Sequence, residues 1–337
     1  MDSWAFSQVA GRVVYFERDT ELAAAAGRNF ARLGADNIEI RCETVTTDTE
    51  LPEADLVYAD PARRDAAGRK VFLLEDCTPD ILTLLPMLLR KAPTVLLKLS
   101  PMADLAMLSD RLGHALREIH IVELDGEVKE LLCLLERDFP TSLEMTSVTE
   151  PEIVVVRLSG QAAAAAPPVP DNSLRFRPSE EREASAVYAA GVQPGEVLLE
   201  PCPALLKAGA FRLPCERWGL RKLAPSTHLY LLPGANMVPS APGKQKKGVP
   251  GAETALSAPG NLFFKARRIC EVLPFGAAAF KTLRQRYPKA GITARNLPLG
   301  SEALRKKMGI AQGGDTHIFG CSLSDGSAVL LVCEAIS

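Results

Sequence analysis

The sequence has few of the residues that build metal sites and disulfide frameworks. Its eight cysteines form no C-x-x-C pair and its four histidines are widely scattered, so no metal-ligand spacing is present. Most of the cysteines lie within apolar runs, which predicts reduced side chains in a protein core. We therefore expect no metal site, and the cysteine usage fits a cytoplasmic protein.

Long apolar runs and a strong net charge are also missing. No run approaches the roughly 20 residues needed to cross a bilayer, and the N-terminus has no basic segment followed by an apolar core, so we expect a cytoplasmic protein without membrane association. The 39 basic and 41 acidic residues give a net charge of -2. Any contact with nucleic acid must therefore come from local basic clusters. A chain of 337 residues with 47% hydrophobic residues can form two or three domains.

The first part of the chain alternates short β-rich runs with helical ones, which is typical of a parallel sheet covered by helices. Two helices are predicted: Asp19 or Thr20 caps the first, which ends near residue 34, and Thr78 caps the second. A strand at 153–158 is expected to pair antiparallel with the strand at 130–136. The other predicted strands are 12–17, 38–42, 56–59, 94–99 and 119–124.

A compositional break follows residue 160. The segment 161–173 contains five consecutive alanines and several prolines, which predicts a linker. After it, 174–260 mixes a helix with short strands and is expected to form a small α+β module. Residues 236–260 are rich in Pro, Gly, Ser, Ala and Lys, and we expect a mobile loop there. The helix is predicted over 179–190 and the strands over 196–199 and 228–232.

The remaining residues, 261–337, alternate strand, helix, strand and helix and end in a predicted hairpin. Its strands are 316–321 and 328–334, and the dipeptide Asp325-Gly326 is typical of a tight turn between them. The fold class predicted for the whole chain is therefore α/β, followed by small α+β domains.

The predicted strand 56–59 runs directly into the segment D-P-A-R-R at residues 60–64. In open α/β sheets ligands bind beyond the carboxyl ends of the strands. Asp60 could therefore point at a bound molecule, while Arg63 and Arg64 reach for phosphate or carboxylate. The alternative is a simple turn in which both arginines are surface charges paired with nearby acids.

Two further charged residues lie at predicted strand ends. Glu17 follows the first strand, where nucleotide-binding α/β folds place an acid that accepts hydrogen bonds from ribose hydroxyls. Lys98 lies near the end of an apolar strand, where an unpaired ammonium group would be costly. We expect Lys98 either to form an ion pair with Asp60 or Glu127, or to face a pocket.

The order of Glu17, Asp60-Pro61 and Lys98-Leu99-Ser100-Pro101 at successive strand ends resembles class I S-adenosylmethionine-dependent methyltransferases. More closely, the chain resembles a bacterial group in which the methyltransferase domain precedes a ferredoxin-like module and a THUMP-like domain. The stretches that carry this closer resemblance are 58–64, 98–102, 126–131 and 295–315. The resemblance implies a Rossmann-like methyltransferase domain over 1–160, a ferredoxin-like module over 174–260 and a THUMP-like domain over 261–337.

The resemblance also implies roles for individual residues. S-adenosylmethionine would be the cofactor, and Asp60 would either accept a proton or orient the nucleophile. The segment at Asp60 lacks the aromatic residue of the Asp/Asn-Pro-Pro-aromatic motif, so N6-adenine methylation is not implied. The implied cofactor-binding residues are Asp2, Glu17, Asp60 and Pro61; the implied catalytic residues are Asp60 and Arg63; the implied substrate-binding residues are Arg63, Arg64 and Lys98.

The family normally opens with a strand and a glycine-rich D-x-x-G-G-x-G-x-D loop, and both are missing here. The segment Asp2-Ser3-Trp4-Ala5-Phe6 resembles the residues that come after the last glycine of that loop. Either the true start lies further upstream, or the protein is degenerate. We favour the first explanation, because a parallel sheet without a central strand would leave backbone groups unpaired.

Basic residues outnumber the nearby acids in the last part of the chain. On a THUMP-like domain such a bias would suit RNA binding, with phosphate contacts that position the substrate. The sequence therefore predicts a methyltransferase that acts on RNA, and the alternative is a non-catalytic RNA-binding protein on a degenerate methyltransferase fold. The basic residues are Lys265, Arg267, Arg268, Lys281, Arg284, Arg286, Lys289, Arg295, Arg305, Lys306 and Lys307.

Overall fold

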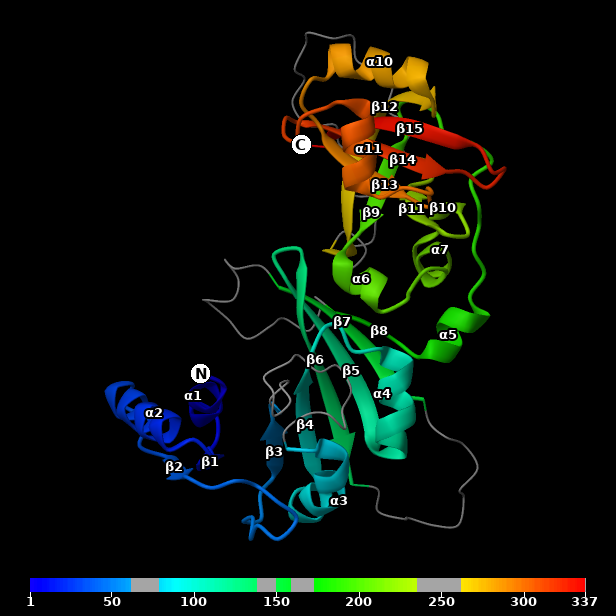
Figure 1. Cartoon of the computed structure of the whole chain (residues 1–337). Helices are drawn as coiled ribbons and strands as arrows, with labels where there is room; N and C mark the ends of the chain where they lie inside the picture. The colour runs from blue at the N-terminus through cyan, green and yellow to red at the C-terminus, as the bar shows by residue number, and fades with distance from the viewer. Residues whose placement is uncertain (62–78, 138–149, 159–172, 235–261, 337) are drawn as a thin grey trace. The chain divides into compact units, whose positions relative to one another are not determined.

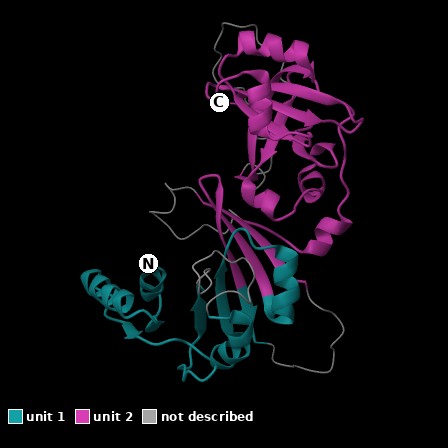
Figure 2. Ribbon diagram, in the orientation of Figure 1, with its two compact units in different colours: residues 1–116, 134–145 teal, residues 117–133, 146–337 magenta. Residues whose placement is uncertain are grey.

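The computed structural model describes residues 1–61, 79–137, 150–158, 173–234 and 262–336. The chain divides into two compact units (Figure 2). Unit 1 comprises residues 1–116 and 134–145, and unit 2 comprises residues 117–133 and 146–337. The predicted loop at 236–260 and nearly all of the predicted linker at 161–173 lie outside the described residues.

Unit 1 is built from alternating helices and short strands (Figure 1). Strands β1 and β2 pair in parallel as a two-stranded sheet, and β3 pairs in parallel with β4, as the alternating pattern predicts. The elements are α1 (Asp2–Ser7), β1 (Val13–Phe16), α2 (Thr20–Arg32), β2 (Ile38–Arg41), β3 (Leu56–Ala59), α3 (Ile81–Lys91), β4 (Thr94–Leu99), α4 (Leu105–Leu112) and the 3-10 turn η1 (Gly113–Ala115).

Aspartates begin both long helices of unit 1. Asp19 caps α2 by accepting hydrogen bonds from the backbone N–H groups of Glu21 (2.9 Å) and Leu22 (3.0 Å). The prediction of Thr78 as the cap of α3 is wrong: α3 begins at Ile81, and Asp80 caps it. A carboxylate is a strong N-cap, and the Asp80 carboxylate satisfies N–H groups in the first turn of the helix that have no partner within it.

Asp80→Ala is expected to lower the free energy of unfolding by about 1 kcal/mol, because the first-turn N–H groups of α3 lose their acceptor. Asp80 Oδ1 accepts from Leu82 N at 3.0 Å and from Thr83 N at 3.3 Å. Urea denaturation of the variants measures the change. Asp80→Asn is the matched control, since an amide oxygen also caps helices; an equal loss in both variants would contradict the capping role.

The burial pattern of β4 decides which way Lys98 points. Side chains alternate between the two faces of a strand, and Val95, Leu97 and Leu99 are buried on one face of β4. Lys98 therefore lies on the opposite face. Parallel pairing places Tyr58 level with Leu96, so Asp60, two residues further on, comes level with Lys98.

Strands β3 and β4 belong to a six-stranded sheet with the order β3-β4-β6-β5-β7-β8. The other strands are β5 (Leu116–Leu124), β6 (Glu127–Glu136), β7 (Glu152–Leu158) and β8 (Ser173–Phe176). The predicted antiparallel pairing of 130–136 with 153–158 is wrong, because β5 lies between β6 and β7 and pairs in parallel with β7. Asp125 and Gly126 both have positive φ angles, 52° and 84°, and form a two-residue turn between β5 and β6. This tight turn makes β6 the neighbour of β5 in the sheet.

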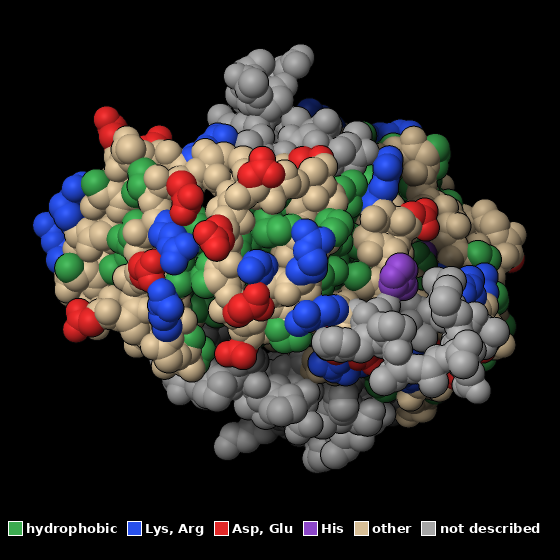
Figure 3. Space-filling view, turned by 90° about the horizontal axis from the view of Figure 1, so that it is seen from below, with side chains coloured by type: hydrophobic (Ala, Val, Ile, Leu, Met, Phe, Trp, Pro, Cys, Tyr) green, Lys and Arg blue, Asp and Glu red, His purple; other side chains and the backbone are tan. Residues whose placement is uncertain are grey.

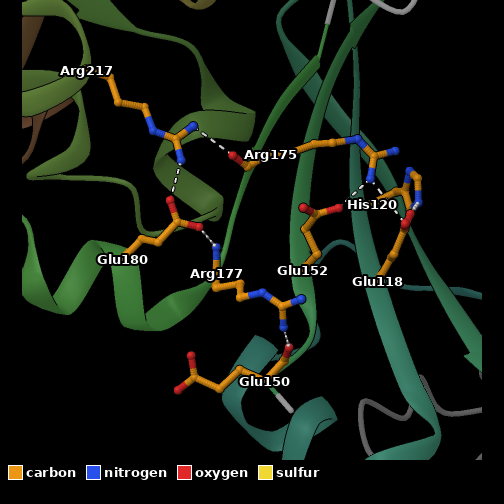
Figure 4. Close-up of polar contacts among 8 residues, drawn as sticks. All are labelled: Glu118, His120, Glu150, Glu152, Arg175, Arg177, Glu180 and Arg217. Atoms are coloured by element: carbon orange, nitrogen blue, oxygen red, sulfur yellow. Dashed lines mark hydrogen bonds and ion pairs between the residues drawn. The ribbon is translucent and has the colours of Figure 1, made fainter.

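A ladder of charged side chains holds the edge strand β8 within unit 2 (Figure 4). Arg175 on β8 forms ion pairs with Glu118 on β5 (Nη1 to Oε1, 3.1 Å) and with Glu152 on β7. Arg217, on α7 (Leu213–Trp218), donates to the carbonyl oxygen of Arg175 (2.7 Å) and to Glu180 (2.6 Å). These partly exposed pairs contribute modestly to stability, but they fix the position of β8 in the sheet.

The predicted helix over 179–190 is shorter in the structure. Helix α5 (Pro178–Glu183) ends where Ala184 takes an extended conformation. Backbone hydrogen bonds from Lys222 N to Val187 O (2.8 Å) and from Ala189 N to Lys222 O (2.9 Å) hold the following residues along another strand. Tertiary pairing therefore overrides the helical pattern beyond Glu183.

A seven-stranded sheet forms the rest of unit 2, with the order β10-β11-β9-β12-β15-β14-β13. The predicted succession of strand, helix, strand, helix and hairpin after residue 261 is confirmed, and β14 and β15 pair antiparallel. The elements are β9 (Val197–Pro201), α6 (Pro203–Lys207), β10 (Arg221–Ala224), β11 (Thr227–Leu231), β12 (Phe264–Pro274), α10 (Ala277–Arg286), β13 (Gly291–Arg295), α11 (Ser301–Met308), β14 (Thr316–Ser322) and β15 (Ala328–Ala335).

The two faces of this sheet have separate apolar cores. Helices α10 and α11 cover one face, where Phe280 and Leu304 pack in a cluster with Ile318. The other face, called here the inner face, carries a second cluster that includes Ile269 and Phe319. Cys321 and Cys333 belong to the inner-face cluster, and Cys133, Cys202 and Cys215 are buried elsewhere; all five are free, as predicted.

Candidate active site

Lys98 is the centre of a charged cluster in unit 1. Its ammonium nitrogen lies 2.6 Å from Asp2 Oδ2 and 2.8 Å from Asp60 Oδ2. Tyr58, near the end of β3, donates a hydrogen bond from its hydroxyl to Asp2 Oδ2 at 2.5 Å. The predicted ion pair between Lys98 and Asp60 is thus confirmed. The other predicted partner, Glu127, pairs with Lys129 instead.

The protonation of this cluster follows from burial and these contacts. Burial lowers the pKa of the Lys98 ammonium, but hydrogen bonds to Asp2, Asp60 and Tyr58 outweigh it, and the pKa of Lys98 rises far above its usual value. The hydrogen bonds from Lys98 and Tyr58 lower the pKa of Asp2. Burial, followed by the hydrogen bond to Asp2, raises the pKa of Tyr58. At neutral pH, Lys98 is therefore a cation and Tyr58 a neutral donor.

Both carboxylates of the cluster are partly exposed. The Lys98 side chain is only 18% exposed, whereas the side chains of Asp2 and Asp60 are 44% and 42% exposed. Two carboxylates face one ammonium group, which leaves the cluster with an excess of negative charge. It can therefore accept hydrogen bonds from, or orient, a positively charged or hydroxyl-bearing group.

Helix α1 brings Asp2 to this cluster. The ring of Phe6 packs against Tyr58 with ring centroids 5.0 Å apart. At the end of α1, the Asn37 side-chain amide, just before β2, donates to the carbonyl oxygens of Ser7 (3.0 Å) and Ala10 (2.9 Å). Helix α1 therefore contacts both pieces of unit 1, the β1–β2 sheet and the β3–β4 strands. In the described part of the chain, β1 pairs with β2 alone and β3 with β4 alone.

Glu17 lies at the end of β1, as predicted. Its carboxylate accepts hydrogen bonds from the backbone N–H of Asp19 (2.9 Å) and from the Tyr15 hydroxyl (3.1 Å). Burial, followed by the Glu17 charge, raises the pKa of Tyr15, so Tyr15 remains a donor to Glu17. Among the described residues, no hydrogen bond or ion pair joins Glu17 to the Lys98 cluster.

The remaining predicted site residues lie close to the cluster in sequence. Pro61 follows Asp60 and is buried. Arg63 and Arg64 lie outside the described residues, so their roles stay predictions. Tyr58 was given no role from the sequence. Its position two residues before Asp60 could have indicated one, because residues two apart on a strand share a face.

Some of the basic residues predicted to bind RNA form ion pairs within the chain, and others are exposed. Four pair with acids of the same chain: Arg286 with Glu271 (2.7 Å), Arg295 with Glu200 (3.2 Å), and both Arg305 (2.7 Å) and Lys306 (3.6 Å) with Glu302. Figure 3 views the molecule from below the orientation of Figure 1 and shows positive and negative side chains interspersed on that one face; it does not single out the residues of α10 or α11. The exposed basic residues on or beside α10 and α11 are Lys281, Arg284, Arg286, Lys289, Lys306 and Lys307.

Two further observations concern metals and membranes. Within the described ranges, no group of three His, Cys, Asp or Glu side chains is placed to hold a metal ion. Among the described helices, none has the length and apolar character needed to cross a bilayer.

The chain is similar to known proteins over its whole length. A ferredoxin-like domain family matches residues 198–235, and a family described as THUMP domain-like matches residues 265–335. A crystal structure from Porphyromonas gingivalis W83, described as a "putative methyltransferase", shares 30% sequence identity with a TM-score of 0.76. The similarity covers 100% of this chain and 74% of that protein. No curated protein matches the chain.

The fold and these matches define a mixed α/β protein related to a protein described as a "putative methyltransferase", with ferredoxin-like and THUMP-like segments. The chain belongs to the family of the Porphyromonas gingivalis protein. The resemblance found in the sequence is thus confirmed at the level of the family.

Proposed function

We propose that this protein is an S-adenosylmethionine-dependent methyltransferase that acts on RNA. The observation that carries the proposal is the cluster of Asp2, Asp60 and Lys98 beside β3 and β4, in a chain of this family. The pieces β1–β2 and β3–β4, with β5 to β7, would form the Rossmann-like methyltransferase sheet of a domain over 1–160. A ferredoxin-like module over 174–260 and a THUMP-like domain over 261–337 would follow.

The described residues fit the cofactor by their chemistry. Each oxygen of the Glu17 carboxylate accepts one hydrogen bond within the chain, and the half-exposed side chain keeps capacity for ribose hydroxyls. Asp2, Asp60 and Pro61 would hold the remainder of the cofactor, where negative charge favours its ammonium and sulfonium groups. When bound, S-adenosylmethionine supplies the electrophilic methyl group.

The protein itself would contribute placement and desolvation at the acceptor atom. Asp60 is a partly exposed carboxylate just after β3 and would hold the acceptor by orienting it or by taking its proton. Arg63, Arg64 and Lys98 would act on the substrate side. Lys98 does so by fixing the direction of the Asp60 carboxylate.

The THUMP-like match supports RNA as the substrate class. The exposed lysines and arginines of α10 and α11 would contact phosphates, and the methyltransferase domain would select the atom. The second candidate is a non-catalytic RNA-binding protein. It is favoured by one observation, the absence of a strand joining β1 to β3 in the described part of the chain.

Glu17→Ala is expected to weaken the binding of S-adenosylmethionine by roughly 10- to 100-fold, because each hydrogen bond to a charged group contributes about 1.5–3 kcal/mol. Isothermal titration calorimetry on the full-length protein measures the dissociation constant. Glu21→Ala is the matched control, since Glu21 is an exposed acid in the first turn of α2. No cofactor affinity in the unmodified protein would favour the non-catalytic candidate.

A further inference from the structure

Arg267, on the inner face of the seven-stranded sheet, is a buried cation that has no acidic partner among the described residues. Its position on β12 is two residues before Ile269, which belongs to the inner core, and only 7% of Arg267 is exposed. Its Nε atom is buried and makes no hydrogen bond. In the described ranges, no carboxylate lies within ion-pair distance of its guanidinium group.

Other basic and polar side chains share this face. Lys265 precedes Arg267 by two residues and is exposed at the start of β12. Arg295, at the end of β13, has a second buried Nε atom without a partner in the described part of the chain. The acid in this region, Glu200 on β9, lies opposite Lys265 in the strand register and forms its ion pair with Arg295. Among the described residues, Glu200 therefore forms an ion pair with only one of these three cations, Arg295.

His317 adds a neutral group to this cluster. Its Nε2 lies 2.8 Å from the Thr293 hydroxyl, and its ring contacts that of Phe319. Gly291 leaves room for the imidazole, since a Cβ atom there would lie 2.4 Å from His317 Nδ1. Burial, followed by the charges of Arg267, Lys265 and Arg295, lowers the pKa of His317 to about 4. The imidazole is thus uncharged at neutral pH and can donate or accept a hydrogen bond.

A purely structural role does not explain this arrangement. A buried guanidinium group is costly unless a carboxylate or several acceptors satisfy it. A methionine would fill the same space beside Ile269 without that cost. The arrangement instead supplies unused N–H donors and excess positive charge. Guanidinium groups with free N–H donors bind a phosphate bidentately.

We propose that Arg267, Arg295 and Lys265 form a phosphate-binding site on the inner face, and that its ligand is a phosphate group of RNA. Arg267 provides the buried donors, Lys265 lies at the exposed entrance, and Thr293 and His317 offer further hydrogen bonds. The identity of the ligand rests on the proposed RNA substrate. The phosphate chemistry rests on the side chains alone.

Arg267→Met tests the site in the full-length protein. Sodium phosphate should raise the melting temperature of the unmodified protein relative to sodium chloride of equal ionic strength, because a ligand that binds only the folded state stabilises it. Arg267→Met should abolish this shift and should melt at or above the temperature of the unmodified protein. It should also weaken binding of a short single-stranded RNA, measured by fluorescence anisotropy, by roughly tenfold.

Arg182→Met is the matched control, because Arg182 is exposed on α5 and paired with Glu150. It should keep the phosphate shift and bind RNA within about twofold of the unmodified protein. If Arg267→Met fails to fold, Arg267→Lys keeps the charge but loses the planar fork, and it should bind phosphate more weakly. Equal phosphate shifts in the unmodified protein and either Arg267 variant would overturn the site.

The RNA-binding measurement distinguishes failure of this site from failure of the proposed function. RNA binding that Arg267→Met leaves unchanged would overturn the site and leave the methyltransferase proposal intact. A phosphate shift that depends on Arg267, in a protein without RNA affinity, would support the site but overturn RNA as its ligand. Free nucleotides, titrated in the same assay, would then be the source of the phosphate.

Discussion

Asp60→Ala is expected to reduce methyl transfer to RNA by about 100-fold or more, while the affinity for S-adenosylmethionine changes much less. Positioned acid–base groups contribute roughly 10²–10⁴-fold to rate, and loss of orientation has effects of similar size. The Asp60 side chain is 42% exposed, so an acceptor can reach this carboxylate beside Lys98. Incorporation of labelled methyl groups into RNA from cells lacking the gene measures the turnover.

Two variants make this experiment specific. Glu53→Ala removes another carboxylate from unit 1, one that pairs with Lys91 at the surface, and should keep full activity. Asp60→Asn can still orient an acceptor but cannot take its proton. Activity retained in Asp60→Asn would assign an orienting role to Asp60, and activity retained in Asp60→Ala would remove it from the reaction.

Glu123→Ala is expected to lower the free energy of unfolding of unit 2 by roughly 3 kcal/mol. The Glu123 side chain is completely buried on β5. One carboxylate oxygen accepts from Ala204 N (2.8 Å) and the other from Arg157 Nε (3.1 Å). The substitution leaves a buried N–H group unsatisfied and a cavity, while Arg157 is partly exposed and regains water.

Chemical denaturation with a probe in unit 2, such as the fluorescence of Trp218, measures this loss. Glu123→Gln keeps an acceptor for Ala204 N and the side-chain volume, so it should lose less stability than Glu123→Ala. Glu127→Ala removes an exposed acid from the same hairpin and should change stability by less than about 0.5 kcal/mol. Equal stability of Glu123→Ala and Glu127→Ala would show that the buried contacts are not needed.

Much of the fold follows from local patterns in the sequence. The strands 56–59 and 94–99 have the predicted bounds, because apolar runs and the breaks beside them are local signals. The predictions are wrong where tertiary contacts determine the conformation or the order of the strands. The segment after Glu183 pairs with β10 instead of continuing a helix, and β5 separates two strands that were expected to be neighbours.

The candidate site was predictable only in part. Lys98 and Asp60 could be paired because both lie at the ends of predicted neighbouring strands. The contact between Lys98 and Asp2 joins residues 96 positions apart, and no periodicity indicates such a contact. The roles of Glu17, Arg63 and Arg64 stay predictions, since cofactor and substrate contacts depend on the ligands themselves.

The seven-stranded sheet has an evolutionary consequence. The ferredoxin-like and THUMP-like matches lie on opposite sides of residue 260, yet β9 and β12 are paired along five residue positions. A gene fragment that ended between them would encode strands with bare edges, which tend to aggregate. Recombination could therefore exchange the two segments only together, as a single heritable block.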